Sequence, residues 1–157
     1  MTKGRFIYDR PERRMPNTQE LASGHKWVLE NSFAFIRPNG QRIFVPQSGI
    51  TLHDILTKPV WTTDYGSIPR PLQNIFSPTE YGDAYILHDW LFAAKLFSKS
   101  ESNTILGEAL EVSAARPGWL ARNTIVAGVR IGSGSAWRSH STSRAFRLRG
   151  FAEMLDA

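Results

Sequence analysis

The sequence predicts an α+β domain, in which a small antiparallel β-sheet is followed by a layer of three to four helices. Residues 27–36 alternate apolar and polar side chains as a strand does, and a turn at 37–40 leads into a second strand. In the second half, the hydrophobic run over 82–97 is typical of a buried helix. The chain of 157 residues is long enough for one domain with a real core.

The N-terminal half is expected to hold the sheet. Residues 1–24 are polar and read as an extended arm that orders only against a partner. Residues 27–36 and 41–46 should form a hairpin, with Asn39-Gly40 supplying positive φ values at its turn. We expect a further short strand within 49–56, then a proline-rich loop over 58–71.

The C-terminal half is expected to be helical. Ser98 followed by Glu101 matches a capping box and predicts the start of a helix that runs to Ala115. The serine-rich stretch 133–143 reads as a flexible connector. The predicted helical segments are 71–76 (one short turn), 82–97, 98–115, 119–131 and 144–155. We therefore expect an N-terminal arm (1–24), an α+β core (25–131) and a basic C-terminal tail (132–157).

Composition and charge exclude some classes of protein. There is no cysteine, which excludes disulfides, thiolate metal sites and a cysteine nucleophile. No apolar run is long enough to span a membrane, and the first residues lack the apolar centre of a signal peptide, so we expect a protein made in a cytoplasm. Between Val112 and Ala152 there are seven arginines and no acid. This imbalance favours an acidic partner, either nucleic acid, lipid headgroups or a neighbouring subunit, over a merely solvated surface.

Four residues form the candidate site. Asp64 and Ser67 lie on the predicted loop, and His88 and Asp89 lie on the predicted buried helix. A buried histidine and carboxylate need partners, and a loop that carries another carboxylate and a hydroxyl can supply them. We therefore expect Asp64 and His88 to meet.

The chemistry of this cluster has three readings. His88 could be a general base with Asp89 as its orienting or cation-binding neighbour. Alternatively, Asp64, His88 and Asp89 could hold a divalent metal such as zinc or calcium, with His53 or Asp54 as an optional further ligand. In the third reading the cluster is structural and bonds a loop backbone. Ser67 lacks the glycine-flanked elbow of a serine nucleophile, and His25, His53 and His140 read as surface or structural histidines.

The motifs resemble one family. Thr63-Asp64-x-x-Ser67-x-Pro69, then Tyr81-Gly82-Asp83-Ala84 leading to His88-Asp89-Trp90-Leu91, is similar to the domain of unknown function 1353 family of tailed phages and prophages. The resemblance covers about residues 43–137. It implies a phage origin and a role for the four candidate residues. Two positions depart from it: Asn103 stands where relatives usually carry Asp, and Phe92 where they usually carry Tyr. If the acid that Asn103 replaces is a catalytic partner or metal ligand, this copy is weakened or purely structural.

The sequence therefore leaves two functional hypotheses. One is a virion component or assembly protein (tail, baseplate or neck) that contacts other phage structural proteins through its arm and arginine-rich tail. The other is a phage-encoded hydrolase of the cell envelope with a His/Asp centre, with or without a metal. The His-Asp-x-x-Phe run also looks like the helix of secreted and viral phospholipases, but their glycine-rich calcium loop and disulfides are missing here.

Overall fold

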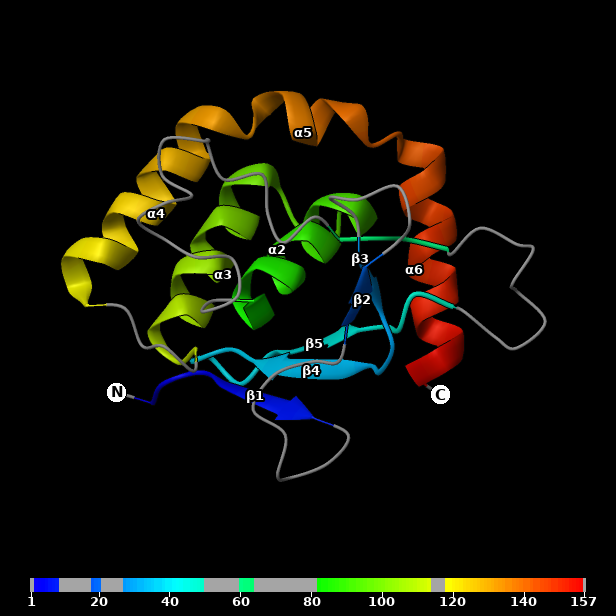
Figure 1. The fold of residues 1–157 in the computed structure, drawn as a ribbon, viewed down its shortest axis with the longest axis horizontal. Helices are drawn as coiled ribbons and strands as arrows, with labels where there is room; N and C mark the ends of the chain where they lie inside the picture. Colours follow the sequence, from blue (N-terminus) through cyan, green and yellow to red (C-terminus); the bar gives the residue numbers. More distant parts are fainter. Residues whose placement is uncertain are drawn as a thin grey trace.

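A computed structural model describes residues 2–8, 18–20, 27–49, 60–63, 82–113 and 118–156. Two central helices, α2 (Gly82–Ala94) and α3 (Lys99–Glu111), lie on a small sheet. Three further helices form an arc around them, as Figure 1 shows: α4 (Trp119–Gly132), α5 (Gly134–Ser139) and α6 (Thr142–Asp156). The predicted α+β class is confirmed.

The main sheet has three antiparallel strands in the order β1-β4-β5. They are β1 (Arg5–Tyr8), β4 (Phe33–Ile36) and β5 (Arg42–Val45), and Phe33 lies opposite both Tyr8 and Val45. A second, two-stranded sheet pairs β2 (Thr18–Glu20) with β3 (Trp27–Leu29). The segment 27–36, which we expected to be one strand, is thus divided between two sheets.

The β4–β5 hairpin is confirmed, but its turn differs in detail from our expectation. The amide of Gly40 donates to the carbonyl of Arg37 at 2.9 Å, and the amide of Arg37 donates to that of Gln41 at 2.8 Å. Gly40 has φ +88°, whereas Asn39 is not left-handed. Asn39 instead accepts the Gln41 amide on its side-chain oxygen. One left-handed residue is enough because this turn has the longer, bulged form of hairpin loop.

Arg37 ties this hairpin to α3. Its guanidinium donates to both carboxylate oxygens of Glu108 at 2.9 Å and to Glu101 at 2.7 Å, and its side chain is only 8% exposed. Ser98 caps α3 as predicted, because its hydroxyl accepts the Glu101 amide at 3.1 Å. The carboxylate of Glu101, the acid of the predicted capping box, therefore bonds Arg37.

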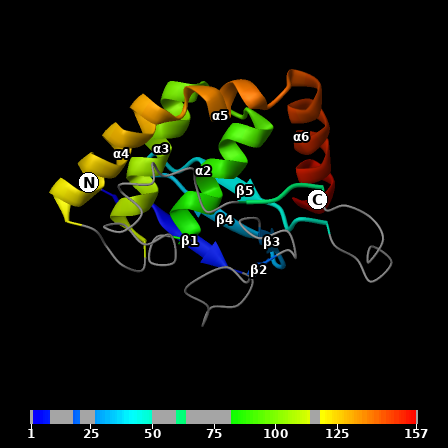
Figure 2. The same ribbon diagram turned by 45° about the horizontal axis from the view of Figure 1, so that its top comes forward.

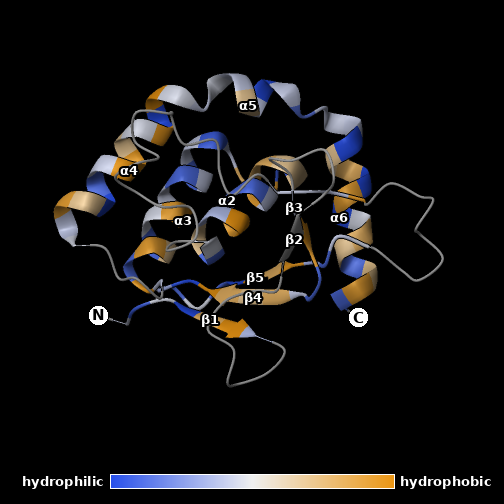
Figure 3. Cartoon of the chain, viewed as in Figure 1, coloured by the Kyte–Doolittle hydropathy of each residue, from blue (hydrophilic) through white to orange (hydrophobic). Residues whose placement is uncertain are grey.

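The helix α2 is the centre of the core. Every one of its residues except Asp89 is buried. Hydrophobic residues predominate in β1, β4 and β5, which are coloured mostly orange in Figure 3, and Phe35 and Val45 are completely buried. None of the described helices has the length and apolarity that a bilayer crossing requires.

The expectation that both ends of the chain order only against a partner is wrong for their described parts. Residues 5–8 form β1 and pair with β4. Ala145 and Leu148 of α6 are buried, and the guanidinium of Arg149 donates to the carbonyl of Ala94 at 2.7 Å. The predicted connector contains α5, while the predicted last helix is confirmed as α6. The strand expected within 49–56 and the helical turn at 71–76 lie almost entirely outside the described residues.

A buried tyrosine–carboxylate pair fixes β1 to the start of α2. The hydroxyl of Tyr8 donates to Asp83 at 2.8 Å, and the Ala84 amide donates to the other carboxylate oxygen at 2.8 Å. Burial raises the pKa of Asp83 from its usual 3.8 to about 6, although these hydrogen bonds oppose the shift. Burial, and then the charge of Asp83, also raise the pKa of Tyr8.

We predict that Asp83→Asn raises stability at pH 7.5 and flattens its dependence on pH. Because the pKa of Asp83 is raised in the folded state, its stabilising contribution is complete below about pH 4 and is lost as pH rises through about 6. The loss is roughly 3 kcal/mol at about 1.4 kcal/mol per pKa unit. Urea unfolding of both proteins between pH 3.5 and 7.5 measures it. Parallel pH profiles for wild type and variant would contradict the prediction.

Candidate functional site

The neighbours His88 and Asp89 face different surroundings. His88 lies 2.8 Å from Asn103 on α3, measured from Nε2 to Oδ1, and both side chains are buried. Because an amide oxygen only accepts, His88 Nε2 carries the proton in this arrangement. The His88 ring also packs on Phe92, with 4.2 Å between ring centroids. Within the described residues, His88 thus has the surroundings of a structural histidine.

Asp89 contacts the segment that precedes the candidate loop. The hydroxyl of Thr63 donates to its carboxylate at 2.5 Å, and Thr63 itself forms a β-bridge with Trp27. A threonine–aspartate bond therefore connects α2 to β3 through one short segment. Asp89 is the half-buried member of α2, and it also lines a pocket.

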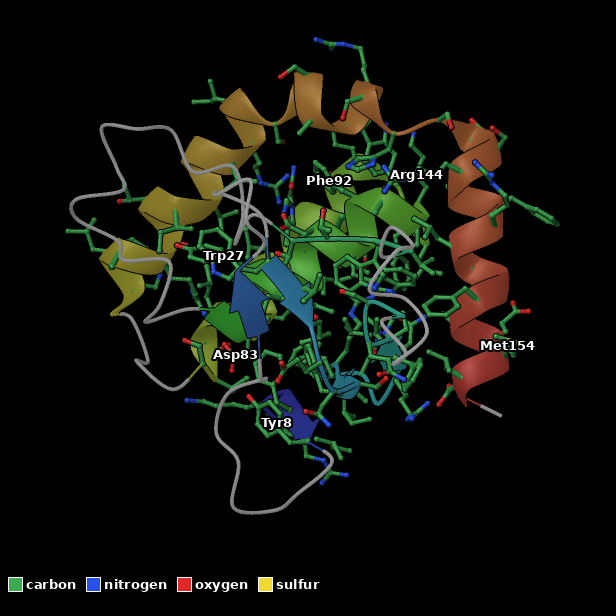
Figure 4. All side chains as sticks on the ribbon, turned by 45° about the vertical axis from the view of Figure 1, so that its right-hand side comes forward. Tyr8, Trp27, Asp83, Phe92, Arg144 and Met154 are labelled. Carbon is green, nitrogen blue, oxygen red and sulfur yellow. The ribbon has the colours of Figure 1, made fainter. Side chains whose placement is uncertain are left out.

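The pocket has a volume of about 580 Å³ and lies where the helical arc passes over the end of α2. Figures 1 and 2 both show α5 above this end, and Figure 4 shows Phe92 and Arg144 there, far from Tyr8 and Asp83. Small and aromatic side chains supply its apolar wall. Its polar lining within the described residues is Thr62, Asp89, Ser135, Ser139, His140 and Arg144.

An aromatic contact holds α5 in place over this pocket. Trp137 packs edge-on against Phe92 at 5.0 Å, and the ammonium of Lys95 lies 4.8 Å from the centre of the Trp137 ring. Lys95 has φ 47°, the left-handed conformation that often ends a helix, and it follows the last residue of α2. Contacts at the end of α2 therefore position α5, which supplies part of the pocket wall.

The structure brings together only part of the predicted site. Asp64, Ser67, His53 and Asp54 lie outside the described residues, so their meeting with His88 stays a prediction. His88 is not among the described residues that line the pocket. Nor do three His, Asp or Glu side chains gather around one point in the described part of the chain. A zinc or calcium site built on His88 and Asp89 would thus need ligands from outside the described residues, such as Asp64, and it also stays a prediction.

Sequence reasoning missed two pocket residues, His140 and Arg144. We expected His140 to be a surface or structural histidine and Arg144 to begin a partner-binding helix. Both lie at or just beyond the serine-rich stretch, where no periodicity or motif indicates a contact with α2. Only the folding of α5 over α2 brings them into the lining of the pocket that Asp89 also lines.

A family model described as "Protein of unknown function (DUF1353)" matches residues 27–129. The chain belongs to the DUF1353 family. No curated protein and no solved structure matches it. The DUF1353 match includes α2, His88, Asp89 and Asn103 and ends within α4. The pocket wall from Ser135 to Arg144 lies beyond the matched range, so the pocket combines the family core with a segment outside it.

We predict that His88 and Asn103 are coupled in stability. Each single change, His88→Ala or Asn103→Ala, removes this buried hydrogen bond and should cost about 1–3 kcal/mol. The double variant should cost less than the two losses added, because the bond is lost only once. Urea unfolding measures the free energies, and Ser135→Ala, at an exposed position, is the control. Additive losses would show that the two side chains do not support each other.

Proposed function

We propose that this protein is a virion-associated or assembly protein of a tailed phage that docks on neighbouring subunits through the outside of its helical arc. The observation that carries the proposal is a set of large apolar side chains exposed there. Five of them are 67% to 88% exposed: Trp119, Leu120, Ile131, Phe146 and Met154. Met154 projects from α6 in Figure 4. Single exposed apolar residues are ordinary, but Leu120 and Ile131 lie in one row on α4, and such a row favours an interaction surface.

The helix α4 has apolar residues on two faces. Its inner face buries Ile125 and Val129 in the core. Its outer face exposes Leu120, Thr124, Ala127 and Ile131, which recur at a spacing of three or four residues. No charged residue occurs in this outer row, so a partner can cover it without burying a charge.

Arginines border the exposed apolar residues. Arg130, Arg138 and Arg147 are all exposed on the arc, and no acid occurs between Val112 and Ala152. The arginines favour an acidic partner, and the apolar row favours a protein over nucleic acid, whose contacts are mostly with phosphates. Other phage structural proteins fit this description, with the particle as the site of action and the host cytoplasm as the site of synthesis. The phage setting rests on the DUF1353 resemblance.

The test compares two variants that each add one acid to the first turn of a helix. Leu120→Asp changes the outer row of α4, and Ser100→Asp changes an exposed position of α3. Both are compatible with a helix N-terminus. In a host that carries the encoding phage, immunoblots of purified particles should show Leu120→Asp reduced at least about tenfold, equivalent to about 1.4 kcal/mol of docking energy. Ser100→Asp should match wild type, and both variants should keep the wild-type melting temperature.

Two outcomes would refute this proposal. One is absence of the wild-type chain from purified particles. The other is equal incorporation of Leu120→Asp and wild type.

The pocket favours a second candidate, a hydrolase of the cell envelope. A histidine beside a carboxylate can move a proton, and His140 and Asp89 share one pocket of a size usual for small-molecule sites. In this reading, His140 takes the role that we first assigned to His88.

We predict for this candidate that His140→Ala abolishes release of soluble fragments from purified host envelopes while leaving the melting temperature within a few degrees. His88→Ala, which affects a residue outside the described pocket lining, should mainly lower stability. Mass spectrometry of the supernatant is the measurement. If wild-type protein releases no fragments, or if His140→Ala releases as many as wild type, this candidate is rejected.

A further inference from the structure

We propose that a second pocket, between β5, the end of α2 and α6, binds a small aromatic carboxylate. In this site Arg149 holds the carboxylate, and the indole N–H of Trp90 donates to it. None of the exposed apolar residues assigned to docking lines this pocket. The inference therefore does not depend on the proposed assembly function.

The second pocket has a volume of about 330 Å³. The helix α6 packs on both α2 and β5, and residues of all three elements line the pocket. The apolar part of the lining includes Ile43, Phe44, Leu96 and Phe97. The volume lies at the small end of the range of about 300–1,000 Å³ for small-molecule sites, which favours a ligand with a single ring.

Trp90 brings an unsatisfied donor to the second pocket. Its side chain lines the pocket and is completely buried, and its ring packs on Trp61 with 5.1 Å between ring centroids. The indole N–H of Trp61 donates to the carbonyl of Pro46 at 3.1 Å, whereas Nε1 of Trp90 has no acceptor among the described residues. A buried donor without an acceptor is costly, and a ligand oxygen bound here would relieve that cost.

Arg149 supplies the positive charge of the second pocket. Its half-buried guanidinium donates to the carbonyl of Ala94, the last residue of α2, at 2.7 Å. This bond holds the guanidinium in place and leaves its other N–H groups to take a carboxylate. Arg37, Arg42 and Arg122 each form an ion pair with an acid of this chain, but Arg149 forms none with the described residues.

Two acids also line the second pocket, and neither prevents an anion from binding. Asp156 forms a two-bond pair with Arg42, at 2.7 and 3.0 Å, so these two charges compensate each other. Glu153 is exposed, and water and salt therefore screen its charge. Arg149 and Trp90 are both more buried than Glu153. The pocket thus favours a ligand whose anionic group lies at its buried end.

The aromatic lining indicates the rest of the ligand. Phe44, Trp90 and Phe97 offer ring faces and edges on which another aromatic ring can pack. A phosphate has no apolar body to cover these rings, and an amine would meet repulsion from Arg149. A single ring that carries one carboxylate satisfies both the charge and the apolar lining.

The ligand test uses the whole chain and three probes: 3-phenylpropionate, its amide and acetate. The amide keeps the ring and loses the charge, whereas acetate keeps the charge and loses the ring. Calorimetric titration should give a dissociation constant for 3-phenylpropionate at least about tenfold lower than for either other probe. Absence of 3-phenylpropionate binding would overturn the proposal. So would equally tight binding of the amide or of acetate.

NMR of the ¹⁵N-labelled protein tests the role of Trp90. Its indole N–H signal, identified by its loss in Trp90→Phe, should shift when 3-phenylpropionate is added. The signal of Trp119, which is 72% exposed and lies outside the lining, should not shift. An unchanged Trp90 signal in the bound protein would overturn the assignment of this donor. If Trp90→Phe does not fold, the three probes and the variants below decide the question.

The variant test compares two arginines of α6. Arg149→Gln should weaken 3-phenylpropionate binding at least about tenfold, while Arg147→Gln, at an exposed position outside the lining, should leave it unchanged. Glu153→Gln removes an exposed acid from the lining and should bind the anion at least as tightly as wild type. Equal effects of the two arginine variants, or weaker binding by Glu153→Gln, would overturn the proposal. If Arg149→Gln does not fold, Glu153→Gln and the three probes decide it.

Discussion

The burial of α2 is the constraint on which the rest of the structure depends. Twelve of its thirteen residues are shielded from water, and among them are an aspartate and a histidine. A buried polar group without a partner costs several times what its hydrogen bond gains, so each of these side chains must find one. Asp83 finds Tyr8 on β1, and His88 finds Asn103 on α3. The polar residues of one helix thereby fix the positions of a strand and of a second helix.

The buried ion pair of Arg37 completes this arrangement from the side of the sheet. Arg37 follows β4 directly, and its two carboxylate partners lie seven residues apart on one face of α3. Because the Arg37 guanidinium is buried, its charge depends on these two carboxylates, so the hairpin and α3 hold each other in register. With α2 and α3 set on the sheet, the remaining three helices have one continuous surface to cover.

The helical arc separates two kinds of surface. On its inside, Ile125, Val129 and Leu148 join the core, and the pocket remains where α5 crosses the end of α2. On its outside, apolar side chains and arginines stay exposed. The DUF1353 match ends at residue 129, before α5 begins. The family core therefore supplies Asp89 and Phe92, and the segment beyond it supplies the opposite wall of the pocket.

The sequence by itself determined the elements whose signals are local. The Pro-Asn-Gly turn predicts the hairpin, the apolar run predicts α2, and Ser98 with Glu101 predicts the start of α3, since each signal depends on residues within one turn or one strand pair. Four features were decided only by the tertiary structure: the pairing of β1 with β4, the folding of α5, the bond between Tyr8 and Asp83, and the presence of His140, Arg144 and Asp89 in the lining of one pocket. Each joins segments about 25 to 75 residues apart or, for α5, depends on the packing of Trp137 against Phe92. The spacing of residues in the sequence cannot predict such contacts, because they form only when α2 is buried and the neighbouring elements pack on it.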